Sequence, residues 1–320
     1  MNENSTASTL RRHEKYDRLI AAAKSLQPIA TAVAHPCDET SLRGAVEAGE
    51  AGLIKPILVG PKDKIAAVAK QYSLNLGNIE IVDVPHSQAA AEKAVELVRT
   101  GKADLLMKGS LHTDELLSEV MKRETGLRTG RRVSHVFVMD VPGHAQTLFI
   151  TDAAVNIAPD LISKRDIIQN AIDLYAGLGL GIPKVAILSA VETVTPTIPS
   201  TIEAAALCKM ADRGQITGGE LDGPLAFDNA ISPEAARIKG IKSPVAGQAQ
   251  ILVVPDLEAG NMLAKNLTFL SHADAAGIVL GARVPIILTS RADHVRTRMA
   301  SCAVAALLRH SQMAKQPIRA

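Results

Sequence analysis

A Ser-Arg pair at the end of an apolar segment is the strongest chemical signal in the sequence. Residues 284–289 read Val-Pro-Ile-Ile-Leu-Thr, Ser290 and Arg291 follow directly, and a helix is expected over Asp293–Arg309. Open α/β sheets bind ligands beyond the carboxyl ends of their strands. Ser290 could cap this helix, which would leave helix N–H groups and the Arg291 guanidinium facing an anion. The alternative is that Ser290 only caps the helix and Arg291 is only solvated.

A loop rich in arginine offers a second place to hold an anion. The segment 126–134 contains two glycines and the three arginines Arg128, Arg131 and Arg132, and it precedes a predicted strand. Guanidinium groups form paired hydrogen bonds with phosphoryl oxygens. The segment suits a phosphate clamp and a solvated basic loop equally well.

Carboxylate and amide side chains adjoin other predicted elements. Asp152 and Asn156 follow one strand and could point into a cleft or serve as turn residues. Asp222 and Asp228 lie six residues apart around a Gly-Pro turn, and turn chemistry alone would explain Asp222. Glu258 opens a predicted helix, where the helix dipole favours an acidic residue without any function.

Motifs for several other chemistries are missing from the sequence. The densest groups of metal-binding residue types are 35–38 (HPCD) and 112–115 (HTDE), and neither has HExxH or paired-cysteine spacing, which favours a site without metal. There is no GxSxG elbow for a Ser–His–Asp hydrolase and no GxxxxGK[ST] loop for a nucleotide. The glycines of Gly177–Gly181 close a helix and precede a strand, so we expect a helix stop and not a dinucleotide loop.

The composition of the 320-residue chain narrows the function classes further. Lys and Arg total 35 and Asp and Glu 33, so the net charge of +2 gives no electrostatic case for nucleic-acid binding. Aromatic residues reach only 2%, which argues against stacking platforms for single strands. Three distant cysteines without a CxxC motif indicate a reducing compartment, and we find no signal peptide and no long apolar run. We therefore expect a cytoplasmic protein without nucleic-acid or membrane partners.

Short apolar segments alternate with amphipathic ones along the chain, and these elements must position the residues above. The predicted strands are 29–34, 56–59, 79–84, 104–107, 133–139, 147–151, 184–189, 250–254, 277–280 and 285–289. The predicted helices are 38–51, 87–100, 160–178, 199–213, 257–270 and 293–309. The alternation indicates an α/β protein with helices on both faces of a sheet, and continuous apolar strands favour parallel pairing. Residues 133–151 interrupt it as a hairpin around Pro142-Gly143, where we expect the chain to cross between two domains.

Taken together, these segments resemble the phosphate acetyltransferase and phosphate butyryltransferase family. Five segments carry the resemblance, in the family's order and at similar spacing: Lys55–Gly60, Asp152–Asn156, Leu221–Asp228, Val254–Asn261 and Leu288–Arg291. The resemblance implies a two-domain, three-layer α/β/α fold like that of isocitrate and isopropylmalate dehydrogenases, with the active cleft between the domains. The first domain would comprise residues 1–139 and 290–320, and the second residues 140–289.

The resemblance also implies the chemistry. Such enzymes transfer a short acyl group, acetyl or butyryl, reversibly between coenzyme A (CoA) and inorganic phosphate, by direct attack of phosphate on the thioester. A homodimer is implied, with CoA as a substrate, no permanently bound cofactor and no metal in the chemistry. The candidate catalytic residues are Ser290, Arg291 and Asp293. The candidate substrate-binding residues are Arg131, Arg132, Ser134, Asp152, Asn156, Asp222, Asp228, Glu258 and Asn261.

Two positions depart from the pattern of the acetyltransferases. The carboxylate expected seven residues after the serine is replaced by Thr297, so Asp293 becomes the candidate general base. An arginine of another family segment is missing at residues 113–117, so Arg131, Arg132 and Ser134 would supply phosphate contacts instead. Both departures weaken the label "acetyl" more than the label "phosphate acyltransferase".

Two other function classes stay open. The missing carboxylate suits a non-catalytic or regulatory protein that binds CoA on the same fold. A metal- and NAD-dependent decarboxylating dehydrogenase is less favoured, because the sequence has no convincing pyrophosphate loop. CoA binding without turnover would support the first class, and absence of NAD binding would dismiss the second.

Overall fold

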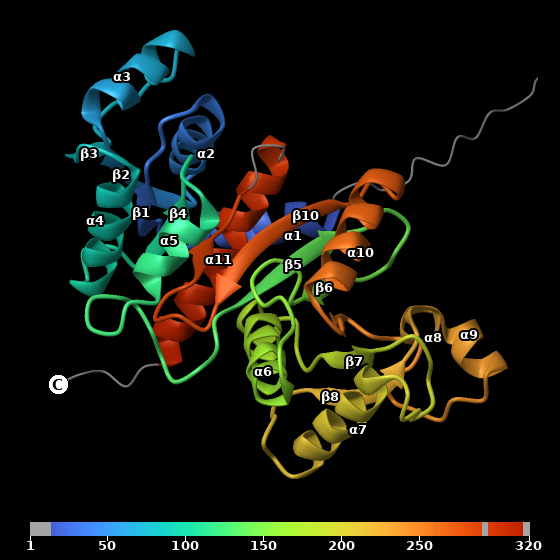
Figure 1. Cartoon of the computed structure of the whole chain (residues 1–320). Coiled ribbons are helices and arrows are strands. Elements are labelled where there is room, and N and C mark those ends of the chain that lie inside the picture. Colours follow the sequence, from blue (N-terminus) through green and yellow to red (C-terminus); the bar gives the residue numbers. More distant parts are fainter. Residues whose placement is uncertain (1–13, 290–293, 316–320) are drawn as a thin grey trace, which may run out of the picture.

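Helices cover both faces of one long sheet in the computed structural model, which describes residues 14–289 and 294–315 (Figure 1). The strands are β1 (Ile29–Ala34), β2 (Ile54–Gly60), β3 (Glu80–Asp83), β4 (Leu105–Lys108), β5 (Ser134–Asp140), β6 (Leu148–Thr151), β7 (Lys184–Leu188), β8 (Glu220–Leu225), β9 (Ile251–Val253), β10 (Asp274–Leu280) and β11 (Ile286–Ile287). The helices are α1 (Glu14–Lys24), α2 (Glu39–Glu50), α3 (Lys62–Gln71), α4 (Ser87–Arg99), α5 (Thr113–Val120), α6 (Leu161–Gly177), α7 (Pro199–Asp212), α8 (Phe227–Ile231), α9 (Pro233–Ile238), α10 (Leu257–Leu270) and α11 (Val295–Lys315). The strands lie side by side in the order β3-β2-β1-β4-β11-β10-β5-β6-β9-β7-β8.

Strand pairing in this sheet is mixed. The strands from β3 to β11 run parallel to one another, as do those from β6 to β8. Between these groups, β10 pairs antiparallel with β11 and with β5, and β5 pairs antiparallel with β6. The expectation of parallel pairing is therefore wrong at the centre of the sheet, because β5–β6 and β10–β11 are joined by short turns, which only antiparallel neighbours accept. The hairpin predicted over residues 133–151 is confirmed.

The core lies on both faces of the sheet because side chains alternate along each strand. In β1, Ile29 and Val33 pack in one hydrophobic cluster, and Ala32 and Ala34 pack in another. The first cluster also takes in α1, α2, α6, α7 and α11. On the other face, α4 and α5 cover the strands around β1, and α8, α9 and α10 cover those around β9. The expected α/β fold with helices on both faces is confirmed.

Several short elements were not predicted: β8 and the helices α1, α3, α5, α8 and α9. The strand β8 corrects an interpretation, since the segment around Asp222 that reads as a Gly-Pro turn is paired in parallel with β7. Proline and glycine are unfavourable inside a strand, but β8 is an edge strand, where they are tolerated. The sheet is continuous, and the predicted division at residues 139 and 289 stays a prediction.

The glycines after α6 confirm the predicted helix stop. The helix ends at Gly177, and Gly179 and Gly181 have φ angles of 74° and 93°, which glycine adopts without strain. Among the described residues, no group of three His, Cys, Asp or Glu side chains could hold a metal ion. Within those same ranges, 14–289 and 294–315, no helix is long and apolar enough to cross a membrane.

Candidate active site

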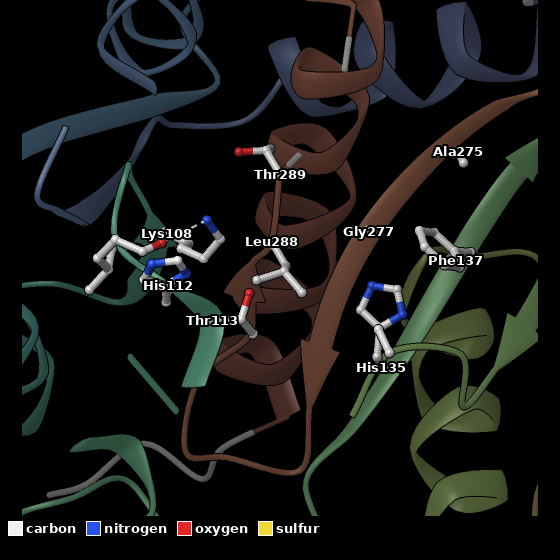
Figure 2. Close-up of a pocket in the computed structure, with 11 residues that line it drawn as sticks. Lys108, His112, Thr113, His135, Phe137, Ala275, Gly277, Leu288 and Thr289 are labelled. Atoms are coloured by element: carbon white, nitrogen blue, oxygen red, sulfur yellow. Dashed lines mark hydrogen bonds between the residues drawn. The ribbon is translucent and has the colours of Figure 1, made fainter. Parts of the chain in front are cut away.

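A pocket of about 430 Å³ lies where four neighbouring strands meet, namely β4, β11, β10 and β5 (Figure 2). It is lined by Lys108, Leu111, His112, Thr113, His135, Phe137, Ala154, Ala275, Gly277, Leu288 and Thr289. Leu288 and Thr289 directly precede the predicted Ser290-Arg291 pair in the chain. Ser290, Arg291 and Asp293 themselves lie outside the described residues. The pocket therefore stands at the point of the fold from which the predicted catalytic segment continues.

One wall of the pocket carries positive charge. This cationic wall consists of Lys108, His112 and Thr113, which come from the end of β4 and the start of α5 (Figure 2). The Lys108 ammonium donates hydrogen bonds to the carbonyls of Gly109 and Leu111, at 3.1 Å each. His112 is the N-cap residue of α5, but its side chain does not cap the helix. A lysine beside a helix N-terminus suits an anion.

Close packing of the backbone shapes the cationic wall. The N–H of Gly109 donates to the carbonyl of Ala34 at 2.8 Å. A Cβ atom added to Gly109 would lie only 2.3 Å from that carbonyl oxygen. Glycine is therefore required after Lys108, and the tight approach turns the chain from β4 toward α5.

The opposite wall of the pocket carries no charged side chain among the described residues. This uncharged wall consists of His135 and Phe137 on β5, and Ala275 and Gly277 on β10 (Figure 2). The ring of His135 meets the ring of Phe137 edge-on, with centroids 4.4 Å apart. Burial lowers the pKa of His135 to about 4, although the nearby carboxylate of Asp152 acts in the opposite direction. The imidazole is therefore neutral at physiological pH.

The structure brings three predicted site residues together behind this wall: Arg132, Asp152 and Asn156. Nε of Arg132 donates to Oδ1 of Asn156 at 2.7 Å. The amide of Asn156 in turn donates to Oδ2 of Asp152 at 2.5 Å and to the carbonyl of Val133 at 2.9 Å. Asp152 and Asn156 are both buried. The network fixes the chain that follows β6 against the segment that enters β5.

Two other residues of the arginine loop have structural partners. Arg131 forms an ion pair with Asp173 of α6. Ser134 is fully buried, and its hydroxyl accepts a hydrogen bond from the Asn170 side chain at 2.9 Å. Neither residue is among those that line the pocket. Their predicted contacts with substrate stay predictions.

The remaining candidates lie toward the other end of the sheet. Asp222 stands on the edge strand β8, where its carboxylate accepts from the N–H of Gly223 at 2.8 Å. Asp228 is exposed and pairs with Lys239 at 3.4 Å. Three strands separate β8 from β5, and neither carboxylate is among the residues that line the pocket. The structure does not bring them together with the pocket residues.

Glu258 and Asn261 lie in the first turns of α10. Glu258 is exposed, and Asn261 donates to the carbonyl of Ala153 at 3.3 Å. The helix is capped by Asp256, whose carboxylate accepts from the N–H of Ala259 at 2.8 Å. Asn261 is thus joined to the loop after β6, next to Ala154 of the pocket.

Thr297 faces a carboxylate that the sequence did not reveal. Its hydroxyl lies 3.5 Å from Oδ1 of Asp274, at the start of β10. Asp274 thus lies opposite the position at which the resemblance predicts a carboxylate.

The residues of the cationic and uncharged walls were not predicted as site residues from the sequence. Lys108 follows a predicted strand and precedes Gly109-Ser110, a position that signals a ligand site at a strand end. In the sequence, His112 stands out only as part of a group of metal-binding residue types. His135 gave no signal, since one histidine within an apolar strand is normally a core residue.

Comparisons with known proteins show the family to which the chain is similar. The family profile described as "Phosphate acetyl/butaryl transferase" matches residues 86–306. A phosphate acetyltransferase of Rhizobium meliloti is 76% identical over 302 residues, which are 94% of this chain and 96% of that protein. A phosphate butyryltransferase of Clostridium acetobutylicum is 43% identical over 295 residues, which are 92% of this chain and 98% of that protein.

Solved structures give the same result for the fold. A branched-chain phosphotransacylase from Enterococcus faecalis is similar with a TM-score of 0.76 and 31% identity, over 88% of this chain and 99% of that one. A 4-hydroxythreonine-4-phosphate dehydrogenase from Burkholderia phymatum has a TM-score of 0.55 at 15% identity, which shows likeness of fold alone. The predicted dehydrogenase-like fold is thereby confirmed.

Proposed function

We propose that this chain, which belongs to the phosphate acetyl/butaryl transferase family, transfers a short acyl group reversibly between CoA and inorganic phosphate. The observation that carries the proposal is the contrast between the two walls of one pocket. The cationic wall suits a phosphate dianion, and the uncharged wall suits an acyl thioester. Both walls adjoin the segment that leads into Ser290 and Arg291.

Phosphate is the nucleophile in this reaction, so the protein needs none of its own. A phosphate oxygen adds to the thioester carbonyl carbon, and the carbon–sulfur bond then breaks to release CoA and the acyl phosphate. The cysteines are unsuited to attack, since burial raises the pKa of Cys37 to about 11 and those of Cys208 and Cys302 to about 12. They are protonated at neutral pH, and a protonated thiol is a poor nucleophile.

The residues divide the remaining tasks. Lys108, the first turn of α5 and Arg291 hold the phosphate, and Ser290 helps to stabilise the oxyanion of the tetrahedral intermediate. In the CoA-acylating direction a base removes the proton of the CoA thiol, whose pKa is roughly 8.5. Asp293 is the candidate base from the sequence, and Asp274 beside Thr297 is a second carboxylate for this task.

We propose acetyl as the preferred acyl group. The relative named phosphate acetyltransferase is 76% identical to this chain, whereas the one named phosphate butyryltransferase is 43% identical. CoA and phosphate then act as substrates, with no permanently bound cofactor, and the enzyme works in the cytoplasm.

We also propose that the active form is a homodimer. Three large apolar side chains of α10 are strongly exposed: Met262 (65%), Phe269 (72%) and Leu270 (74%). Such a group on one helix is typical of an interface, and a second copy of the chain is the partner that the family resemblance implies.

The purified protein should be mixed with CoA and a series of acyl phosphates, from acetyl to butyryl and branched chains. Thioester formation, followed by ultraviolet absorbance, should be fastest with acetyl phosphate. Turnover with a longer chain only would overturn the acetyl assignment. A folded protein that binds CoA but turns over none of the series would overturn the enzyme itself and favour a regulatory CoA-binding protein.

The base is tested with Asp293→Asn and Asp274→Asn. The variant that removes the base should lower the rate of CoA acylation and change its pH profile, while the other keeps both. If Asp293→Asn retains the wild-type rate and profile, then Asp293 is only a residue near a helix start.

A further inference from the structure

His135 is the pocket residue whose placement a purely structural role leaves unexplained. Its side chain is 1% exposed, yet it lines the pocket from β5. Nδ1 is buried and meets no hydrogen-bond partner among the residues that the structure describes. An unpaired buried polar atom destabilises the folded state, so a protein that keeps one generally has a use for the group.

The neighbours of the ring hold it without bonding to it. Phe137 contacts it edge-on, and Thr151 donates a hydrogen bond to the backbone carbonyl of His135 at 2.8 Å, not to the ring. The nearest carboxylate is already occupied: Oδ1 of Asp152 accepts from the N–H groups of Ala154 and Val155, and Oδ2 accepts from the backbone and side-chain N–H groups of Asn156. Asp152 therefore serves its own loop rather than the imidazole.

The other ring nitrogen, Nε2, faces Gly277 of β10. A Cβ atom added to Gly277 would lie 3.0 Å from Nε2 and 2.7 Å from the carbonyl oxygen of Leu288, so a glycine is needed for the ring and this carbonyl to lie so close to β10. Figure 2 shows the ring directed from β5 toward Gly277 and the interior of the pocket. A buried N–H without an acceptor is rarer than a lone pair without a donor, so the ring proton belongs on Nε2 and not on Nδ1. The ring thus presents an N–H group to the pocket.

We propose, on the basis of the function proposed above, that His135 contacts the substrate: its Nε2–H donates a hydrogen bond to the acyl carbonyl oxygen. As hydrogen phosphate forms its bond to the carbonyl carbon, the electron pair of the C=O double bond moves onto this oxygen. The pair returns as the carbon–sulfur bond breaks, and the proton carried by hydrogen phosphate ends on the CoA sulfur. His135 stabilises the oxyanion between these steps and neither gains nor loses a proton.

The surrounding charges favour a donor over a base. Within residues 14–289 and 294–315, the titratable side chains that face His135 are Asp152 behind it, and Lys108 and His112 across the pocket. Burial outweighs the Asp152 charge and leaves the pKa of His135 at about 4. So weak a base takes a proton poorly from a thiol with a pKa of roughly 8.5. A ring that stays neutral remains a hydrogen-bond donor at every pH at which the enzyme would work.

The test compares His135→Leu, which removes the donor at similar size, with His135→Gln, which keeps an N–H donor. We expect leucine to lower kcat by about 100-fold, the effect of losing one oxyanion donor, while KM for acetyl-CoA changes less than about threefold. Glutamine should restore at least about a tenth of the wild-type rate. His144→Gln is the matched control, since His144 is half-buried and is not among the pocket-lining residues; its rate should equal that of the wild type.

A second measurement does not need turnover. The ring ¹⁵N resonance of His135 is assigned as the one that is absent from the spectrum of His135→Gln. Acetyl-CoA added to the wild-type protein without phosphate should shift this resonance, and CoA alone should shift it less. A leucine variant within about threefold of the wild-type kcat would overturn the role of His135 while leaving the proposed function intact. An unshifted ring resonance would overturn it too, even if the leucine variant fails to fold. A wild-type protein without any turnover would overturn the proposed function and this role together.

Discussion

The two walls of the pocket solve opposite problems with charge. On the cationic wall, Lys108 stands at the end of a strand and the helix N-terminus of α5 begins beside it. On the uncharged wall, His135 lies within β5 and is almost completely buried. A strand end leaves an ammonium group at the surface of the pocket, whereas burial within a strand favours the neutral form of an imidazole. The burial of the side chain therefore decides which wall can bind an anion.

This difference fits an acyl transfer between two unlike substrates. Phosphate brings charge and needs a cation, whereas the thioester carbonyl is neutral until the nucleophile adds. A cation permanently at the carbonyl would also attract phosphate to the wrong place. Separate walls keep the two substrates apart, so a change on one wall should affect one substrate more than the other.

The largest effect should be a loss of stability in acid. The pKa of His135 is about 4 in the folded protein and 6.5 is its ordinary value, so the unfolded chain binds more protons between these values. The free energy of unfolding should be highest above pH 6.5 and fall by at most roughly 3 kcal/mol as the pH reaches 4. Urea unfolding at several pH values measures this fall. His135→Gln should reduce the slope, and an unchanged slope would place the acid sensitivity elsewhere.

On the cationic wall, Lys108→Met should weaken the use of phosphate. The loss of a charge-assisted contact should lower kcat/KM for phosphate by about 10- to 100-fold. Initial rates at fixed acetyl-CoA and varied phosphate measure the change. Lys93→Met is the control, because Lys93 lies on α4 and pairs with Glu96 away from the pocket. Equal losses in both variants would show that net charge, and not this wall, attracts phosphate.

Behind the uncharged wall, Asp152→Asn should destabilise the fold. The substitution places an amide N–H₂ group against N–H donors of the loop, which should cost about 2 kcal/mol. Asp228→Asn is the matched change at an exposed site and should stay within about 0.5 kcal/mol of the wild type. Chemical denaturation compares the two. A loss as small for Asp152 as for Asp228 would mean that the buried network contributes little.

Arg291→Ala should leave the fold intact and lower kcat/KM by about tenfold or more, because a guanidinium contact with phosphate is lost. The double variant with Lys108→Met shows whether the two cations share one phosphate. If they do, the combined loss differs from the sum of the single losses. Kinetics of Arg291→Ala close to those of the wild type would remove this residue from the phosphate site.

The success of sequence reasoning differed between regions for physical reasons. The β5–β6 hairpin was predictable because its turn residues and apolar segments are adjacent in the chain. The strand β8 was not, because its Asp-Gly-Pro sequence resembles a turn and only pairing with β7 makes it a strand. The Arg132–Asn156–Asp152 network was partly predictable, since these polar residues flank strands. Its geometry depends on contacts across 24 positions of sequence.

The sequence alone determined the alternation of strands and helices, the helix stop at Gly177 and the family, because local chemistry and order along the chain carry that information. Which polar residues share a pocket depends instead on how distant strands pair in the folded sheet. Lys108 and His135 lie 27 positions apart and on separate strands, and they line opposite walls of one pocket because only β11 and β10 separate β4 from β5 in the sheet. Tertiary burial also decided that His135 is neutral, since desolvation by distant segments sets the pKa of a side chain that the sequence shows only as one histidine among apolar residues.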